Sequence, residues 1–133
     1  MADARFTLLN RTNEIGANSY LLEIGEIRIV LDAGMHPKKS GTDSIPRFED
    51  LPPDSIDAII VTHSHLDHVG SLPLLMRDQP SARVFMTPGT AALAEALLHN
   101  SVNVMKSQRL ELGIEEYPLF THRGLDELFP RVE

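Results

Sequence analysis

Short apolar runs organise the first part of the chain. Apolar and β-branched residues over 4–9, 19–24 and 27–31 predict three strands, because such runs bounded by Asn, Gly and Asp are typical of sheet. The last two runs are separated only by Gly25 and Glu26. A two-residue Gly-X link of this kind predicts a hairpin with a type II′ turn.

Two stretches lack such a pattern. Residues 10–18 are rich in Asn, Thr and Gly, and residues 35–54 hold four of the nine prolines, so we expect both to be loops. The second stretch begins soon after Asp32, a carboxylate at the end of the third predicted strand. We expect a surface loop with a short helical turn near Phe48. A loop of this length in a compact domain is usually functional or mobile.

The rest of the chain alternates strand and helix patterns. Residues 57–61 form a continuous apolar run, typical of a strand buried in a parallel sheet. The pattern then predicts a helix over 70–78 with Pro73 in its first turn, a strand over 83–86, a helix capped by Thr90 that covers 91–98 and continues toward Lys106, and a short helix capped by Thr121 that ends at Leu128. This order predicts an α/β fold whose mixed sheet starts antiparallel.

Metal-ligand residues are concentrated directly after the predicted strand over 57–61. His63 and His65 are spaced i, i+2, so in extended backbone they point to the same side, while Leu66 points away and can anchor the segment in the core. Asp67 and His68 follow, and a turn there can aim both at a neighbouring position. Two cations about 3.5–4 Å apart could share these ligands.

The chain has no cysteine, which excludes disulfides and thiolate metal sites. Imidazole and carboxylate ligands suit zinc, with manganese or iron as alternatives. A histidine-rich loop without catalytic consequence is the alternative interpretation. We give it little weight, because three histidines and an aspartate fall within six positions at the end of a buried strand.

The segment Thr62-His63-Ser64-His65-Leu66-Asp67-His68 resembles the His-x-His-x-Asp-His signature of the metallo-β-lactamase fold hydrolases. Flanking segments resemble the β-CASP branch of that family: Asn13-Glu14-Ile15-Gly16, Tyr20-Leu21-Leu22, Leu31-Asp32-Ala33-Gly34, Met35-His36-Pro37, His68-Val69-Gly70-Ser71-Leu72-Pro73-Leu74-Leu75, Thr87-Pro88-Gly89-Thr90 and Leu97-Leu98-His99-Asn100-Ser101. The resemblance covers nearly the whole chain. It implies a partial αββα fold with helices on one side of the sheet.

The resemblance also implies site roles. His63 and His65 would bind a first Zn²⁺, and Asp67 and His68 a second, with Asp67 also contacting the bridging water as a catalytic residue. Asp32 would orient the metal loop rather than bind metal, and such support matters for ligand geometry. Members of the branch are zinc-dependent nucleases, including messenger RNA 3′-end processing enzymes and exonucleases. A metal-bound hydroxide would then hydrolyse RNA phosphodiester bonds.

Three other histidines fall outside the signature. The resemblance gives no ligand role to His36, His99 or His122, and we expect ordinary surface or packing residues. Lys38 and Lys39 form the only adjacent basic pair. We expect this pair to be solvated rather than bound to phosphate.

The family completes its site with later ligands and a β-CASP domain, neither of which is recognised here. We therefore expect residues 1–133 to be the N-terminal portion of a metallo-β-lactamase domain that binds metal weakly and hydrolyses little alone. We also expect the isolated chain to form a homodimer through an exposed sheet face. Two alternatives remain open: a hydrolase of small esters, thioesters or lactones, and a noncatalytic partner or truncated remnant.

Charge and hydropathy bound location and partners. The net charge of −7 weighs against nonspecific binding to nucleic acid and mildly favours the small-molecule alternative. No apolar run approaches the roughly 20 residues of a membrane helix, so we expect no membrane partner. The N-terminal residues lack the apolar core of a secretion signal, and we expect a cytoplasmic location.

Overall fold

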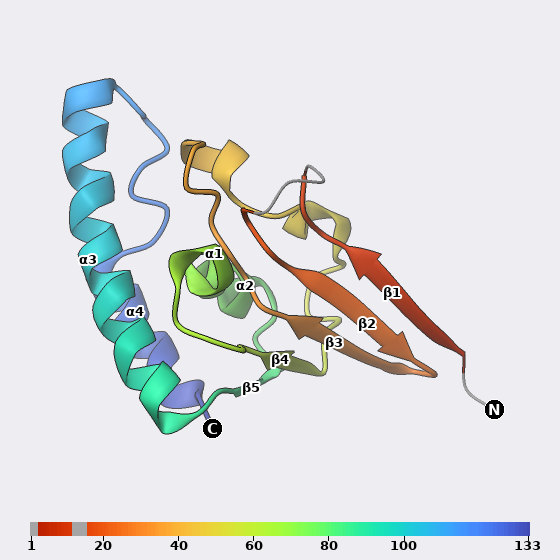
Figure 1. Cartoon of the computed structure of the whole chain (residues 1–133). Coiled ribbons are helices and arrows are strands. Elements are labelled where there is room, and N and C mark those ends of the chain that lie inside the picture. The colour runs from red at the N-terminus through yellow and green to blue at the C-terminus, as the bar shows by residue number, and fades with distance from the viewer. Residues whose placement is uncertain (1–2, 12–15) are drawn as a thin grey trace.

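A five-stranded mixed sheet forms the centre of the molecule in the computed structural model, which describes residues 3–11 and 16–133 (Figure 1). Its strands are β1 (Ala4–Leu8), β2 (Tyr20–Ile24), β3 (Ile27–Leu31), β4 (Ala58–Ile60) and β5 (Arg83–Phe85), and they lie side by side in that order. The first three pair antiparallel, and β3, β4 and β5 pair parallel. The predicted α/β class and antiparallel start are confirmed.

The hairpin between β2 and β3 has the predicted two-residue turn. Ile24 pairs with Ile27, which leaves only Gly25 and Glu26 to connect the strands. Gly25 adopts a φ of 60°. This left-handed value is what a type II′ turn requires at its first central position, and glycine adopts it without steric cost. By contrast, the family-like segment Asn13-Glu14-Ile15 lies outside the described residues, as do Met1 and Ala2.

The long loop over 35–54 contains two short 3-10 helices, η1 (Gly41–Ser44) and η2 (Phe48–Asp50). The second confirms the turn predicted near Phe48. The loop is more than a surface connection, because Phe48 packs into the core and the Gly41 amide donates to the Tyr117 hydroxyl at 2.9 Å. These contacts fix the loop over the ends of the strands.

The helix predicted over 70–78 corresponds to α2 (Leu72–Asp78), which has Pro73 in its first turn, as predicted. A further short helix, α1 (Leu66–Val69), forms where a turn was predicted, and two residues separate it from α2. Leu66 was predicted to anchor the segment in the core, but it is 37% exposed. Val69 is fully buried instead. The helical turn rotates Leu66 outward, whereas the prediction assumed extended backbone.

Two further α-helices form most of the chain after β5. Helix α3 (Pro88–Leu112) is continuous, and the Thr87 side chain accepts the cap hydrogen bond from the Thr90 amide at 3.2 Å. Thr90 was therefore the wrong N-cap, because Pro88 is itself tolerated in the first turn. Helix α4 (His122–Leu128) has the predicted Thr121 cap, and η3 (Phe129–Arg131) follows it.

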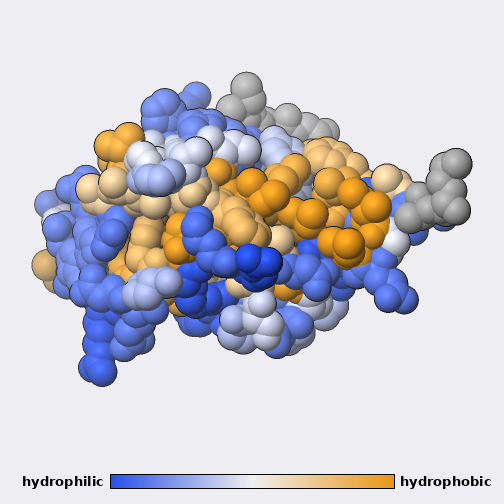
Figure 2. Space-filling model, turned by 90° about the horizontal axis from the view of Figure 1, so that it is seen from below, coloured by the Kyte–Doolittle hydropathy of each residue, from blue (hydrophilic) through white to orange (hydrophobic). Residues whose placement is uncertain are grey.

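The two faces of the sheet differ in burial. Leu21, Val30 and Ile59 are buried beneath the helices, which lie on one side of the sheet (Figure 1). Residues at alternate positions of the strands point to the other face, where Phe6 is 59% and Ile27 is 55% exposed. Figure 2 shows a broad band of hydrophobic residues on the underside of the molecule, where β3 to β5 form the lower edge of Figure 1.

Among residues 3–11 and 16–133, no helix combines the length and the apolar character that a membrane crossing needs.

Candidate metal centre

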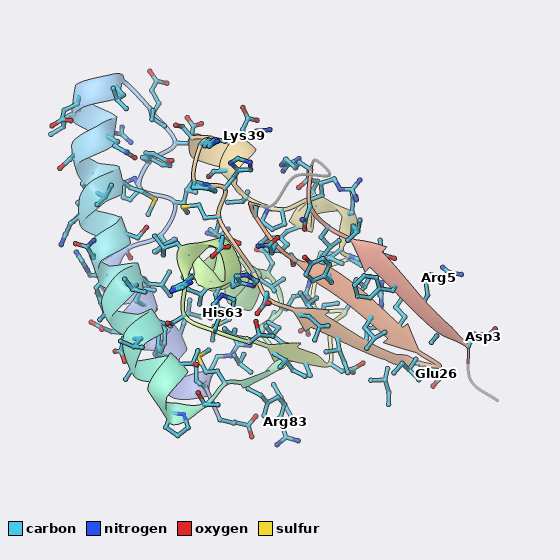
Figure 3. The ribbon with its side chains drawn as sticks, in the orientation of Figure 1. Asp3, Arg5, Glu26, Lys39, His63 and Arg83 are labelled. Atoms are coloured by element: carbon cyan, nitrogen blue, oxygen red, sulfur yellow. The ribbon has the colours of Figure 1, made fainter. Side chains whose placement is uncertain are left out.

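The candidate centre lies at the carboxyl ends of β3 and β4, where open α/β sheets place their sites. Asp32 directly follows β3, and His63 lies three residues beyond the end of β4. Asp67 and His68 are carried by α1. Figure 3 shows His63 beside α1, between the sheet and α3. The parallel pairing of β3 with β4 thus brings together side chains that are far apart in sequence.

Backbone hydrogen bonds hold α1 against the segment that leaves β3. The amides of Ala33 and Met35 donate to the carbonyl oxygens of His68 and Leu66, both at 2.8 Å. Gly34 between them has no room for a side chain, because a Cβ there would lie 1.9 Å from the Asp67 carbonyl oxygen. The metal motif is therefore fixed through its main chain as well as its side chains.

Asp32 is buried and is the main acceptor of the centre. Its φ of 60° is left-handed, which aspartate tolerates better than most residues. One carboxylate oxygen accepts from the Thr62 amide at 2.7 Å, and the other accepts from the Thr62 hydroxyl at 2.8 Å and pairs with His68 Nδ1 at 2.8 Å. These three contacts hold the unusual backbone in place.

The Asp32 carboxylate sets which ring nitrogens face the site. Because His68 Nδ1 donates to Asp32, His68 Nε2 is left with its lone pair toward Asp67, whose Oδ2 lies 3.5 Å away. The Thr62 hydroxyl, which donates to Asp32, lies 3.2 Å from His63 Nδ1 and can accept a hydrogen bond from it. Both rings are then free to bind a cation through Nε2.

Three of the four expected ligands form one group. Ligand atoms of His63, Asp67 and His68 all lie within 4.8 Å of one another, and the three residues are half-buried. The His65 ring lies edge-on to His63, with centroids 5.1 Å apart, and is outside this group. Two imidazoles and a carboxylate are a donor set that fits Zn²⁺ or a similar divalent cation, so the residues present fit the expected metal.

Asn18 is a further residue of the centre that the sequence did not predict, since its pattern indicated only a loop over 10–18. The Asn18 side-chain amide lies 3.5 Å from Asp67 Oδ2 and 3.4 Å from His68 Nε2, the two atoms that would bind a cation. Asn18 is buried, although it follows a stretch of polar loop residues. A buried polar side chain beside a metal motif is the signal that would have found it, and burial is visible only in the structure.

A cavity of about 480 Å³ opens beside Asp67, between α3 and the loop that follows β3. Its wall is mainly apolar and includes Met35, Pro37, Leu66, Val104 and Met105, with polar groups from His36, Lys39, Asn100, Ser101, Gln108 and Tyr117. Pockets of about 300–1,000 Å³ are typical of small-molecule sites. The candidate centre therefore lies at the edge of a space large enough for part of a substrate.

Among the described residues, the three histidines outside the signature do not belong to the ligand group of His63, Asp67 and His68. His36 is buried, and its ring packs against Gly16 so closely that a Cβ there would lie 2.2 Å from it. His99 and His122 contact each other between α3 and α4. The exposed pair Lys38 and Lys39 precedes η1, and Figure 3 shows Lys39 at the upper end of the molecule.

Relatives of known function resemble nearly the whole chain. Endoribonuclease YSH1 of Candida glabrata is 34% identical over 130 residues, which cover 97% of this chain and 17% of that protein. The YSH1 endoribonuclease of Saccharomyces cerevisiae is 33% identical with the same coverage of both chains. Cleavage and polyadenylation specificity factor subunit 3-I of Arabidopsis thaliana is 32% identical, covering 96% of this chain and 18% of that protein. The chain thus spans about a sixth of the length of these relatives.

Among solved structures, a chemotaxis sensor described as a peroxy diiron species matches 68% of this chain and 36% of its own, at 20% identity and a TM-score of 0.49. A B3 metallo-beta-lactamase with an active-site glutamic acid covers 65% of this chain and 31% of its own, at 22% identity and a TM-score of 0.48. The family of this chain is shown by its sequence rather than by these structures. The model of the metallo-beta-lactamase superfamily matches residues 12–129, and the chain belongs to that superfamily.

Proposed function

We propose that this chain is the metal-binding portion of a divalent-metal-dependent nuclease that hydrolyses RNA phosphodiester bonds. The grouping of His63, Asp67 and His68 around a buried, orienting Asp32 carries the proposal. Relatives named endoribonucleases support RNA as the substrate. Zinc as the metal and a cytoplasmic location stay predictions.

We assign the ligand roles as follows. His63 and His68 would bind through Nε2, because hydrogen bonds to Thr62 and Asp32 occupy their Nδ1 atoms. Asp67 would supply a carboxylate oxygen, and His65, whose ring lies edge-on to that of His63, would be the fourth ligand. A bound cation would act as a Lewis acid on the scissile phosphate. The catalytic role expected for Asp67 stays a prediction.

The chain alone should bind metal weakly and cleave RNA slowly, because it offers four ligands to a site that would hold two cations. The experiment compares purified chain with Zn²⁺, with chelator, and with His63→Ala, on a labelled RNA. We expect little cleavage that depends on both metal and His63. RNA cleavage by the chain that disappears with chelator and with His63→Ala would show that it is active by itself.

A second candidate is hydrolysis of a small ester, thioester or lactone. The largely apolar cavity of about 480 Å³ beside Asp67 favours it, as does the net charge of −7, which disfavours long-range attraction of RNA. A panel of RNA and small ester substrates separates the two candidates. Turnover of an ester that is lost in Met105→Trp, which fills the cavity, would favour this second function.

A further inference from the structure

A second polar cluster lies between α3 and α4 and shares no residue with the candidate centre. It consists of Glu95, His99 and Asn103 on α3, spaced i, i+4, and His122 and Asp126 on α4, also i, i+4. Residues with this spacing lie on one face of a helix. The His99 and His122 rings stack with centroids 5.0 Å apart and an angle of 10°. We call these five residues the α3–α4 cluster.

The contacts of the cluster form a single chain that alternates between the helices. Asn103 Oδ1 lies 2.9 Å from His122 Nε2, and His122 Nδ1 lies 2.7 Å from His99 Nδ1. At the end of the chain, His99 Nε2 lies 3.4 Å from Asp126 Oδ1. Each hydrogen bond needs one proton, so the state of any ring nitrogen fixes the others.

With Asn103 Oδ1 as acceptor, the protons follow in order. His122 Nε2 donates to Asn103, so His122 Nδ1 is an acceptor and His99 Nδ1 must donate to it. A neutral His99 then has only a lone pair on Nε2, and that lone pair faces the Asp126 carboxylate. Two acceptors that face each other repel, and a proton or a cation between them relieves that repulsion. Rotation of the Asn103 amide reverses the order of donors and places a proton on Nε2 of the neutral His99 ring, which then donates to Asp126.

A divalent cation can take the place of that proton. Ligand atoms of Glu95, His99 and Asp126 all lie within 4.8 Å of one another. Imidazole nitrogen and carboxylate oxygen are both ligand types that Zn²⁺ binds, and metal-bound histidines usually have their second ring nitrogen held by a hydrogen-bond partner. Glu95 and Asp126 also line a groove of about 480 Å³ with Ala91, Ala92, Phe129, Pro130 and Val132, which leaves space for water ligands.

We propose that Glu95, His99 and Asp126 bind a divalent cation of the Zn²⁺ type, which joins α3 to α4. His122 and Asn103 are positioning residues that keep the proton on His99 Nδ1 and leave Nε2 for the metal. This site is independent of the nuclease function proposed above, because it uses none of the same residues.

The test removes the candidate centre and measures metal binding at the cluster. In a background of His63→Ala, Asp67→Ala and His68→Ala, the full chain is titrated with Co²⁺, and the visible absorption of the bound ion is recorded. We expect one equivalent of Co²⁺, displaced by Zn²⁺. Adding His99→Gln, or Asp126→Asn with Glu95→Gln, abolishes it. His122→Ala weakens binding about tenfold or more, because the partner of His99 Nδ1 is lost.

The matched control is Glu111→Gln, which removes an exposed carboxylate from the same helix and leaves binding unchanged. Circular dichroism of each variant distinguishes a loss of metal binding from a loss of folding. Because Glu95 and Asp126 are exposed, we expect the variant with both substitutions to fold. Absence of Co²⁺ binding in the background variant, or equal binding after His99→Gln, would overturn the proposal. The cluster would then be a hydrogen-bonded contact between helices, and the proposed nuclease function would stand unaffected.

Discussion

At Asp32 both the backbone and the side chain are unusual. The residue combines a φ of 60° with a buried carboxylate that contacts Thr62 twice and His68 once. A left-handed conformation in a residue other than glycine persists only where the surroundings fix it, and such positions cluster at functional sites. We infer that the strain is offset by the three contacts that orient the candidate ligands.

Asp32→Asn tests this role. Asparagine tolerates the same backbone and nearly the same volume, but it lacks the charge that stabilises the His68 Nδ1 proton. We expect metal affinity to fall about 10–100-fold, as for other outer-shell partners of metal-bound histidines. Competition with a chromophoric chelator measures the affinity, and Asp43→Asn, at an exposed residue of η1, is the control. Unchanged affinity in Asp32→Asn would remove Asp32 from the centre.

Gly34→Ala tests the fit between α1 and the end of β3. The new Cβ would lie 1.9 Å from the Asp67 carbonyl oxygen and 2.7 Å from the Asn18 amide nitrogen. Both atoms are backbone, so relief requires a main-chain shift, and we expect a loss of about 3 kcal/mol in unfolding free energy. Urea denaturation measures it. Gly89→Ala is the control. No atom lies within 4 Å of the new Cβ, and alanine favours helix more than glycine does, so the unfolding free energy should rise or stay unchanged.

At the scale of the elements, two substitutions distinguish Thr87, the observed N-cap of α3, from Thr90, the N-cap predicted from the sequence. The Thr87 side chain accepts from the Thr90 amide, so Thr87→Ala removes an N-cap and should cost about 1 kcal/mol. Thr90→Ala keeps that amide donor and loses only the hydroxyl contact with Thr87, at 2.9 Å, so it should cost clearly less. Thermal unfolding of the two variants compares them. A larger loss in Thr90→Ala would restore the cap predicted from the sequence.

An ion pair joins the loop after β1 to η2. Arg11 contacts both carboxylate oxygens of Glu49, at 2.8 and 3.1 Å, and its hydrogen bond lowers the pKa of Glu49 below the ordinary value of 4.5. The folded state therefore favours the charged form, so the pair contributes to stability above pH 4.5 and loses that contribution as pH falls through the lowered pKa.

Glu49→Gln tests that pair. Because Glu49 is largely exposed, we expect the variant to be less stable by under about 1 kcal/mol at neutral pH. The difference from the unaltered chain should vanish under acid, where Glu49 is protonated in both states. Urea denaturation as a function of pH measures both values. A difference that grows with acid would contradict the assigned direction of the pKa shift.

The elements that sequence predicted well are those with strong local signals. The β2–β3 hairpin follows from Gly25 at its turn, and Thr121 marks the start of α4, because each signal acts within a few residues. The failures depend on distant contacts. The amides of Ala33 and Met35 stabilise α1 by binding its carbonyl oxygens, so the Leu66 prediction failed.

The candidate site divides in the same way. The signature residues are readable from spacing alone, and Asp32 could be assigned only through a family resemblance. The contact of Asn18 with Asp67 and His68 depends on a chain reversal that brings together residues about fifty positions apart. The pairing of His99 with His122 likewise requires α4 to pack on α3. No local pattern encodes either contact.

At the scale of the whole molecule, the uncovered face of the sheet has a clear consequence for association. Phe6, Leu8, Ile24 and Ile27 are each more than 40% exposed on one side, and large exposed apolar patches usually mark interfaces. We propose that the isolated chain forms a dimer through this face. Light scattering at micromolar concentration should report a dimer, and Phe6→Lys with Ile27→Lys should shift it to monomer. A monomer before any substitution would contradict the proposal.

The order of strands in the sheet also bears on how the chain acquires its shape. Every strand lies beside the one that precedes it in sequence, so each can add to an edge that already exists. Asp32 and His63, which follow β3 and β4, are synthesised before α3 and α4. During synthesis, the ligand framework could therefore assemble on a nascent sheet, since domains begin to fold from their N-terminal part. Ribosome-bound chains that end after α2 would then already protect the β2–β3 amides from exchange.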